Sequence, residues 1–160
     1  MKLARELEFE EVDGIDASST AVAAASAFGS AGVAEMTKLP HGDSTFDAVI
    51  STGVVYYGAL ADLERAAWEI RRVLKPDGWG FITTKSTRDW RRGSGDQIAE
   101  ETFVLRIPGE PEDGMTLTFL SAAEVGRVFG VFRDLRVELA EHTTMNRLRV
   151  NSDWLVTVWK

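Results

Sequence analysis

The chain has 160 residues, long enough for one domain with a sizeable core and too short for two ordinary domains. Its 18 Lys and Arg against 25 Asp and Glu give a formal net charge of −7, which disfavours a nucleic-acid partner because a phosphate backbone attracts positive charge. Cysteine is absent and only two histidines are present, so we expect no metal site.

Neither the N-terminal residues nor the most apolar stretch of the chain points to a membrane. The N-terminal residues alternate charged and apolar side chains, which is not the pattern of a signal peptide. The most apolar stretch, residues 48–61, is too short to span a bilayer. We therefore expect no membrane partner and a cytoplasmic location.

The first half of the chain alternates short strands with helices. Capping oxygens from Asp16, Ser18 and Ser19 precede an alanine-rich run that Gly29 ends, and Pro76 ends the clearest helical pattern. The expected elements are the end of a helix at 3–8, a strand at 11–15, a helix at 20–25, strands at 33–36 and 46–51, a helix at 62–74 and a strand at 79–84.

In the second half of the chain, the apolar periodicity is weak at first and becomes regular again toward the C-terminus. Residues 85–115 read as a long excursion with a strand near 102–107, and order returns at 116–119. Ser121 and Glu124 form a capping-box signature for a helix through 129. Two antiparallel strands are expected at 135–139 and 154–159. The predicted class is α/β, with a mainly parallel sheet and antiparallel C-terminal strands.

Four phrases stand in a recognisable order: VDGIDASS at 12–19, EMTKLP at 35–40, FDAVISTGV at 46–54 and EIRRVLKPDG at 69–78. Together they resemble the class I (Rossmann-like) S-adenosylmethionine-dependent methyltransferases, in the branch that methylates small molecules. The resemblance covers about residues 3–84. It implies a Rossmann-like three-layer sandwich, S-adenosylmethionine as cofactor and a small-molecule acceptor.

The resemblance places adenosine-binding residues after two successive strands. Asp16, followed by Ala17, stands where an acidic residue accepts hydrogen bonds from the ribose hydroxyls. Glu35 stands where an acidic residue meets the adenine amino group, and the backbone amide of Met36 where it meets the ring. Two simpler interpretations stay open, namely that Asp16 caps the following helix and that Glu35 is a solvated strand end.

The loop after the next strand borders the cofactor in such enzymes. Ser51, Thr52 and Gly53 match it, and Tyr56 and Tyr57 fall where side chains usually face the acceptor. An alternative is that the two tyrosines serve packing as well as the pocket.

The excursion at 85–115 lies where the family carries acceptor-binding loops. Trp90 and Arg91 belong to a local basic patch with Lys85, Arg88 and Arg92, which suggests an anionic or aromatic acceptor. The alternative is a solvated loop. Methyl transfer is an in-line displacement that needs positioning in a dry pocket, so no catalytic base is assigned.

One family element is absent from this sequence, the Gly-rich turn after the first strand. The glycines at 28–32 follow the strand at 11–15 and do not match it. We therefore expect a single methyltransferase-like domain over 1–160, truncated at the N-terminus and lacking its first strand. That leaves two sheet edges, which either pair directly or are covered by a second copy in a homodimer. The alternative function is an inactive module that binds a nucleoside weakly or acts as a dimeric interaction protein.

Overall fold

The computed structural model describes residues 9–160. The helix end predicted at 3–8 lies outside the described residues. The chain divides into two compact units, Met1–Pro40 and His41–Lys160, and each unit is described by itself.

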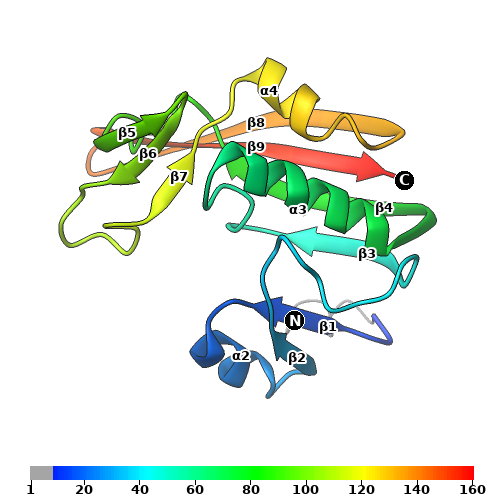
Figure 1. Ribbon diagram of the computed structural model, residues 1–160. Helices are drawn as coiled ribbons and strands as arrows, with labels where there is room; N and C mark the ends of the chain where they lie inside the picture. The colour runs from blue at the N-terminus through cyan, green and yellow to red at the C-terminus, as the bar shows by residue number, and fades with distance from the viewer. Residues whose placement is uncertain (1–8) are drawn as a thin grey trace. The chain divides into compact units, whose positions relative to one another are not determined.

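The first unit is a strand–helix–strand arrangement. Its elements are β1 (Asp13–Asp16), α2 (Ser19–Ala25) and β2 (Ser30–Val33) (Figure 1). The two strands pair in parallel, with Asp16 opposite Val33. The Ser18 hydroxyl caps α2 by accepting from the Ala21 amide at 3.4 Å. The predicted strand and helix of this unit are confirmed within a few residues.

The second strand of this unit starts earlier than predicted. The sequence favoured 33–36, whereas β2 ends at Val33, and Glu35 begins a turn closed by the Lys38 amide donating to the Glu35 carbonyl at 3.1 Å. The small residues of β2 have little intrinsic strand preference, so pairing with β1 rather than local sequence sets this strand.

The second unit is built on a four-stranded sheet in the order β3-β4-β9-β8. The strands are β3 (Phe46–Ser51), β4 (Leu74–Lys85), β8 (Asp134–Thr144) and β9 (Arg149–Trp159). β3 and β4 are parallel, while β4 with β9 and β8 with β9 are antiparallel. The α/β class is confirmed, with a larger antiparallel share than the mainly parallel sheet that was predicted. β1 belongs to the two-stranded sheet of the first unit and β3 to the four-stranded sheet of the second. The pairing expected for their edges stays a prediction.

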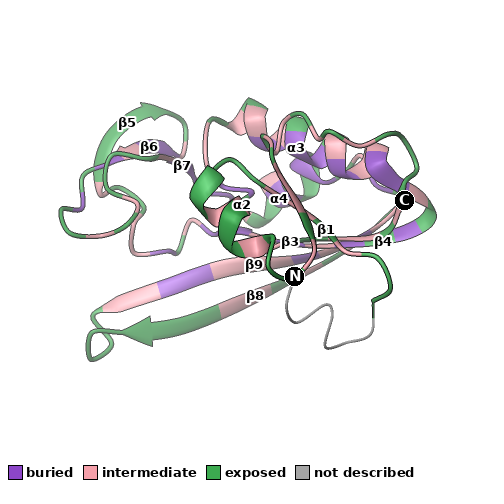
Figure 2. Cartoon of the chain, turned by 90° about the horizontal axis from the view of Figure 1, so that it is seen from below, coloured by how far each residue is buried: buried purple, intermediate pink, exposed green. Residues whose placement is uncertain are grey.

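The helix α3 (Leu60–Val73) connects the two parallel strands, as predicted. The Asp62 carboxylate accepts from the Ala59 amide at 3.0 Å and so satisfies a donor at the start of the helix. One face of α3 is buried, and Figure 2 shows this face in purple. The buried residues are Leu63, Ala66, Ala67, Ile70 and Val73.

The excursion contains a second, three-stranded sheet in the order β5-β6-β7. Its strands are β5 (Gly95–Ala99), β6 (Thr102–Leu105) and β7 (Thr116–Thr118), and α4 (Ala122–Val128) follows. The sequence predicted β6, β7 and α4 but missed β5, because all five residues of that strand are exposed and carry no apolar alternation. The capping box of Ser121 and Glu124 is confirmed.

The C-terminal hairpin is longer than predicted. β8 and β9 pair from Asp134 opposite Trp159 to Thr144 opposite Arg149. The last four residues of β8 are exposed, so they lack the apolar signal that marks a strand in the sequence (Figure 2). Within residues 9–160, no helix has both the length and the apolar character needed to cross a membrane.

The capping box of α4 makes a testable contribution to stability. We expect Ser121→Ala to lower the free energy of unfolding by about 1 kcal/mol, because the Glu124 amide loses its acceptor and the reciprocal bond to the Ser121 amide loses its support. Urea unfolding followed by tryptophan fluorescence measures this. All five tryptophans lie in the second unit.

Ser18→Ala is the matched control, because it removes the same hydroxyl from the start of α2, a helix with no buried residue. It is expected to leave the tryptophan-monitored transition unchanged. Equal effects of the two substitutions would contradict the prediction.

Candidate cofactor and acceptor site

Asp16 ends β1 with an exposed side chain. Its Oδ1 accepts from the Ser18 amide at 2.8 Å, and its carbonyl accepts from the Ala34 amide at 3.1 Å. The cap of α2 itself is the Ser18 hydroxyl. Asp16 is therefore not the capping residue of α2, although it accepts a hydrogen bond from that residue. The carboxylate shapes the turn into the helix while it stays accessible to a ligand.

Glu35 and Met36 follow β2 at the same edge of the two-stranded sheet. Asp16 pairs with Val33, and Glu35 comes two residues later. The Glu35 side chain is exposed and Met36 is half-buried. Because β1 and β2 are parallel, their carboxyl ends meet at one edge, where ligands of open α/β sheets bind. The structure thus brings the two predicted carboxylates to the same edge of the first unit.

The loop after β3 exposes its backbone at Gly53. This residue has φ +73°, a conformation that favours glycine. Its amide donates to the Thr83 hydroxyl of β4 at 2.8 Å. Among the described residues, a Cβ added at Gly53 would meet only the Tyr56 hydroxyl, at 3.7 Å. The loop of Ser51, Thr52 and Gly53 is therefore anchored from β4 and has an open face beside the Tyr56 hydroxyl. Thr83 was missed because a strand threonine has no sequence signal of this role.

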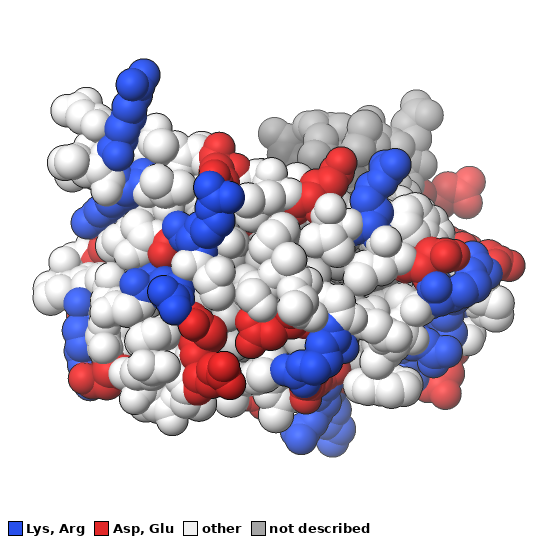
Figure 3. All heavy atoms as spheres, turned by 90° about the horizontal axis from the view of Figure 1, so that it is seen from above, with Lys and Arg blue, Asp and Glu red and all other residues white. Residues whose placement is uncertain are grey.

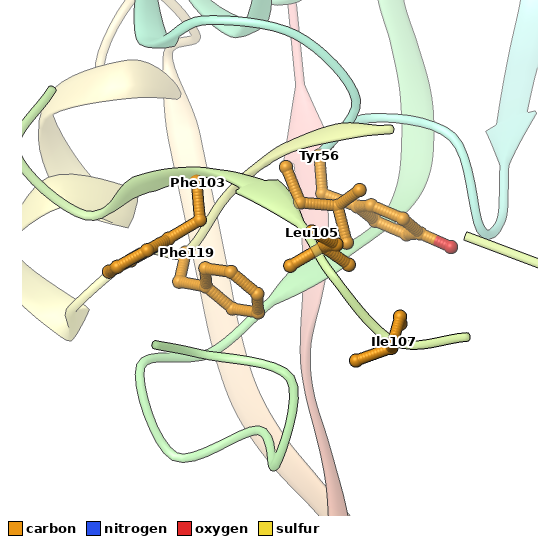
Figure 4. Packing of buried hydrophobic residues seen from close by; sticks show 6 residues of the cluster. Tyr56, Phe103, Leu105, Ile107 and Phe119 are labelled. Atoms are coloured by element: carbon orange, nitrogen blue, oxygen red, sulfur yellow. The ribbon is translucent and has the colours of Figure 1, made fainter. Parts of the chain in front are cut away.

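Tyr56 is buried with 6% of its surface exposed. Figure 4 shows its ring beside the apolar cluster and its hydroxyl directed away from it. The other buried members of the cluster are Phe103, Leu105, Ile107, Leu117 and Phe119. The rings of Tyr56 and Tyr57 lie 4.5 Å apart between centroids. Burial, with a hydrogen bond to Tyr57, raises the pKa of Tyr56, so its hydroxyl stays protonated at neutral pH.

A buried ion network adjoins Tyr56 at the carboxyl end of β4. The Lys85 Nζ lies 2.7 Å from Asp153 Oδ1, 3.4 Å from Asp89 Oδ2 and 5.4 Å from the centroid of the Tyr56 ring. The Asp89 carboxylate is fully buried and accepts from the backbone amides of Arg91 at 3.0 Å and Ser152 at 3.1 Å. The network therefore attaches the first residues of the 85–115 segment to β9. The sequence analysis missed Asp89 and Asp153.

Trp90 and Arg91 are also bound to β9. The Trp90 indole N–H donates to Asn151 Oδ1 at 3.2 Å, and the Arg149 guanidinium lies 3.9 Å from the ring centroid. Arg91 pairs with Asp89 at 3.1 Å and with Glu112 at 3.3 Å. Both residues thus already have protein partners, and their contact with an acceptor stays a prediction.

The basic patch predicted around Trp90 is compensated by carboxylates. Arg88 pairs with Glu141 at 3.0 Å and Arg92 pairs with Glu101. Figure 3 shows acidic and basic side chains intermixed over one face of the molecule. The sequence does not show which carboxylates the fold brings to these arginines, and contact of this patch with an acceptor stays a prediction.

The surroundings of the two histidines do not indicate a role as general base. His41 packs edge-on against Phe46 with ring centroids 4.8 Å apart, and His142 is exposed near the end of β8. In the part of the chain that the structure describes, no three His, Cys, Asp or Glu residues are grouped so as to hold a metal ion.

Comparison with known proteins gives a family match and a fold match. The family model described as methyltransferase domain matches residues 1–82. The ribosomal protein uS12 methylthiotransferase RimO of Alkalilimnicola ehrlichii is 30% identical over 91 residues, which are 56% of this chain. The chain spans about a fifth of the length of that relative, 20%.

Two solved structures illustrate the fold match. A methyltransferase dependent on S-adenosylmethionine from Mesorhizobium loti has a TM-score of 0.75 at 16% identity, covering 99% of this chain and 84% of that one. Another from Methanosarcina mazei has a TM-score of 0.71 at 19% identity, covering 92% and 81%. The family match extends over half of this chain, and the fold match over nearly all of it. The chain therefore belongs to the methyltransferase domain family, and its Rossmann-like α/β fold is that of enzymes whose cofactor is S-adenosylmethionine.

Proposed function

We propose that this chain transfers a methyl group from S-adenosylmethionine to a small-molecule acceptor by in-line displacement. The cofactor supplies an electrophilic methyl group on a sulfonium, whose carbon–sulfur bond breaks as the bond to the acceptor forms. The observation that carries the proposal is the pair of exposed carboxylates, Asp16 and Glu35, at the carboxyl edge of β1 and β2. The family match favours this activity over an inactive interaction module.

The residues of the first unit fit an adenosine. The Asp16 carboxylate at the end of β1 would accept both ribose hydroxyls, and its hydrogen bond from the Ser18 amide holds it in place for this. Glu35 would accept from the adenine amino group, and Met36 would offer its backbone amide. Ala17, beside Asp16, has a short side chain that leaves the turn open.

The residues of the second unit fit an acceptor beside the loop of Ser51, Thr52 and Gly53. The Tyr56 hydroxyl lies next to the open face of Gly53, and its oxygen can accept a hydrogen bond from an N–H or O–H group of the acceptor. Tyr57 supplies an adjoining aromatic surface. The ion network of Lys85 and Asp89 keeps this wall rigid, which favours positioning of the acceptor over general-base chemistry.

The ion pairs of the arginines near Trp90 favour an uncharged acceptor over an anionic one. Arg88, Arg91 and Arg92 each face a carboxylate, so an anionic acceptor would have to displace an existing partner. We therefore favour an uncharged aromatic acceptor, in contact with Tyr57 and with Trp90 and Arg91 at its far side. The single-domain organisation, the truncated N-terminus, the acceptor role of 85–115 and the cytoplasmic location stay predictions.

Binding of S-adenosylhomocysteine tests the adenosine site. Isothermal titration is expected to show binding to the parent chain and a dissociation constant at least about tenfold higher for Asp16→Ala and for Glu35→Ala, because each loses charge-assisted hydrogen bonds of about 1.5–3 kcal/mol. Asp13→Ala, on the same strand, is the control with unchanged affinity. A parent chain that does not bind, or an Asp16→Ala variant with unchanged affinity, would overturn the site.

Transfer of label tests the class of acceptor. The chain is incubated with methyl-labelled S-adenosylmethionine and, separately, with the dialysable and the macromolecular fractions of a cell extract. We expect label in products of the dialysable fraction. Label confined to the macromolecular fraction would refute a small-molecule acceptor, and label in neither would favour the inactive module.

The rigidity of the acceptor wall depends on Asp89. Asp89→Ala removes the fully buried carboxylate that pairs with both Lys85 and Arg91, and it leaves the backbone amides of Arg91 and Ser152 without this acceptor. We therefore expect the free energy of unfolding to fall by about 3–5 kcal/mol. Asp96→Ala, which removes a carboxylate from an exposed pair with Arg106, should cost at most about 1 kcal/mol. Urea unfolding compares the two, and similar losses would show that the network does not stabilise the wall.

A further inference from the structure

β8 is the last strand of the four-stranded sheet and has one unpaired edge. β9 pairs with it along its whole length, and no other strand of residues 9–160 pairs with it. Figure 2 shows β8 along a margin of this sheet. A free edge of this kind carries backbone amide and carbonyl groups that can pair with another strand.

Side chains on β8 alternate strictly near its start. Leu135, Val137 and Leu139 are half-buried, whereas Arg136 and Glu138 are exposed on the other face. Neither Arg136 nor Glu138 has an ion-pair partner in the described part of the chain, unlike most of the arginines near the excursion. Two opposite charges, both unpaired and two residues apart, therefore flank Val137 on an open edge.

We propose that this edge pairs with β8 of a second copy of the chain, antiparallel about a twofold axis through Val137. Each residue then faces the one at equal distance beyond Val137 in its partner. Arg136 lies opposite the partner's Glu138, and Leu135 opposite the partner's Leu139. Every charge pair formed by these residues is attractive, and the apolar residues meet on one face.

Neighbouring registers are disfavoured by charge. In a continuous antiparallel sheet, residues that lie opposite each other have their side chains on the same face. A twofold axis between two copies of β8 therefore passes through a residue and not between two residues. Moving it one residue toward the N-terminus places Arg136 against itself, and moving it one residue the other way places Glu138 against itself. Like charges directly opposite are destabilising. The register through Val137 is thus selected over both neighbours.

This pairing differs from the homodimer predicted from the sequence, which uses the edges of β1 and β3. β8 and β3 are opposite ends of the four-stranded sheet, so the loop of Ser51, Thr52 and Gly53 stays outside the interface. The dimer would join two four-stranded sheets, and the proposed acceptor residues of one copy would not contact the other copy. It does not rest on the proposed function.

Charge reversal and its restoration test the dimer. Sedimentation velocity of the 160-residue chain over about 1–100 µM should show a monomer–dimer equilibrium. Arg136→Glu and Glu138→Arg should each raise the dissociation constant at least about tenfold, because both central pairs become repulsive. The double substitution should restore dimerisation, because the pairs are attractive again. Arg65→Glu, the same change at an exposed position of α3, is the control with no effect.

A cysteine at the axis gives an independent test. The chain has no cysteine, so Val137→Cys supplies one thiol per copy, and two copies would bring these thiols together. Mild oxidation should give a disulfide-linked dimer with Val137→Cys and not with Arg65→Cys. A parent chain that is monomeric throughout, a double substitution that fails to restore dimerisation, or equal cross-linking of the two cysteine variants would overturn the proposal.

Discussion

Parallel strand pairing is the constraint on which the candidate site depends. In the first unit β1 and β2 run the same way, so Asp16 and the turn at Glu35 share an edge. In the second unit β3 and β4 run the same way, so Lys85 at the end of β4 and the loop after β3 that contains Gly53 share an edge. Antiparallel pairing would send successive strand ends to opposite edges. Within each unit, strand direction thus brings together candidate residues that are separated in the sequence.

The proposed acceptor side of the second unit combines an apolar cluster with buried charges. Tyr56 has its ring against the cluster, while Lys85 lies over the ring and is held by Asp89 and Asp153. Burying these charges is costly unless each finds a partner, and the backbone amides that donate to Asp89 supply part of the compensation. The arrangement gives a rigid wall with one protonated hydroxyl at its end, which suits positioning of an acceptor.

Local signals predicted the elements that carry their own information. β3 has an apolar run, α3 has helical periodicity, and α4 has a capping box, so all three were located from the sequence within two residues. β2 and β5 were misplaced or missed because small or exposed residues become strands only through their partners. The two carboxylates of the proposed adenosine site were assigned through motif resemblance, and their role stays a prediction. Asp89 and Asp153 were not, because their role arises from contacts between segments far apart in the sequence.

The two ends of the four-stranded sheet present different chemistry. β3 carries Ile50 with 57% of its surface exposed, and the one acidic residue within the strand, Asp47, is paired with Lys75. β8 instead exposes Arg136 and Glu138, and charged residues on an edge strand normally prevent pairing with other chains. Because the two charges are opposite in sign and flank one residue, they oppose registers displaced by one residue while allowing the register about Val137. The same pair of side chains can therefore protect the edge from unrelated strands and admit a second copy of this one.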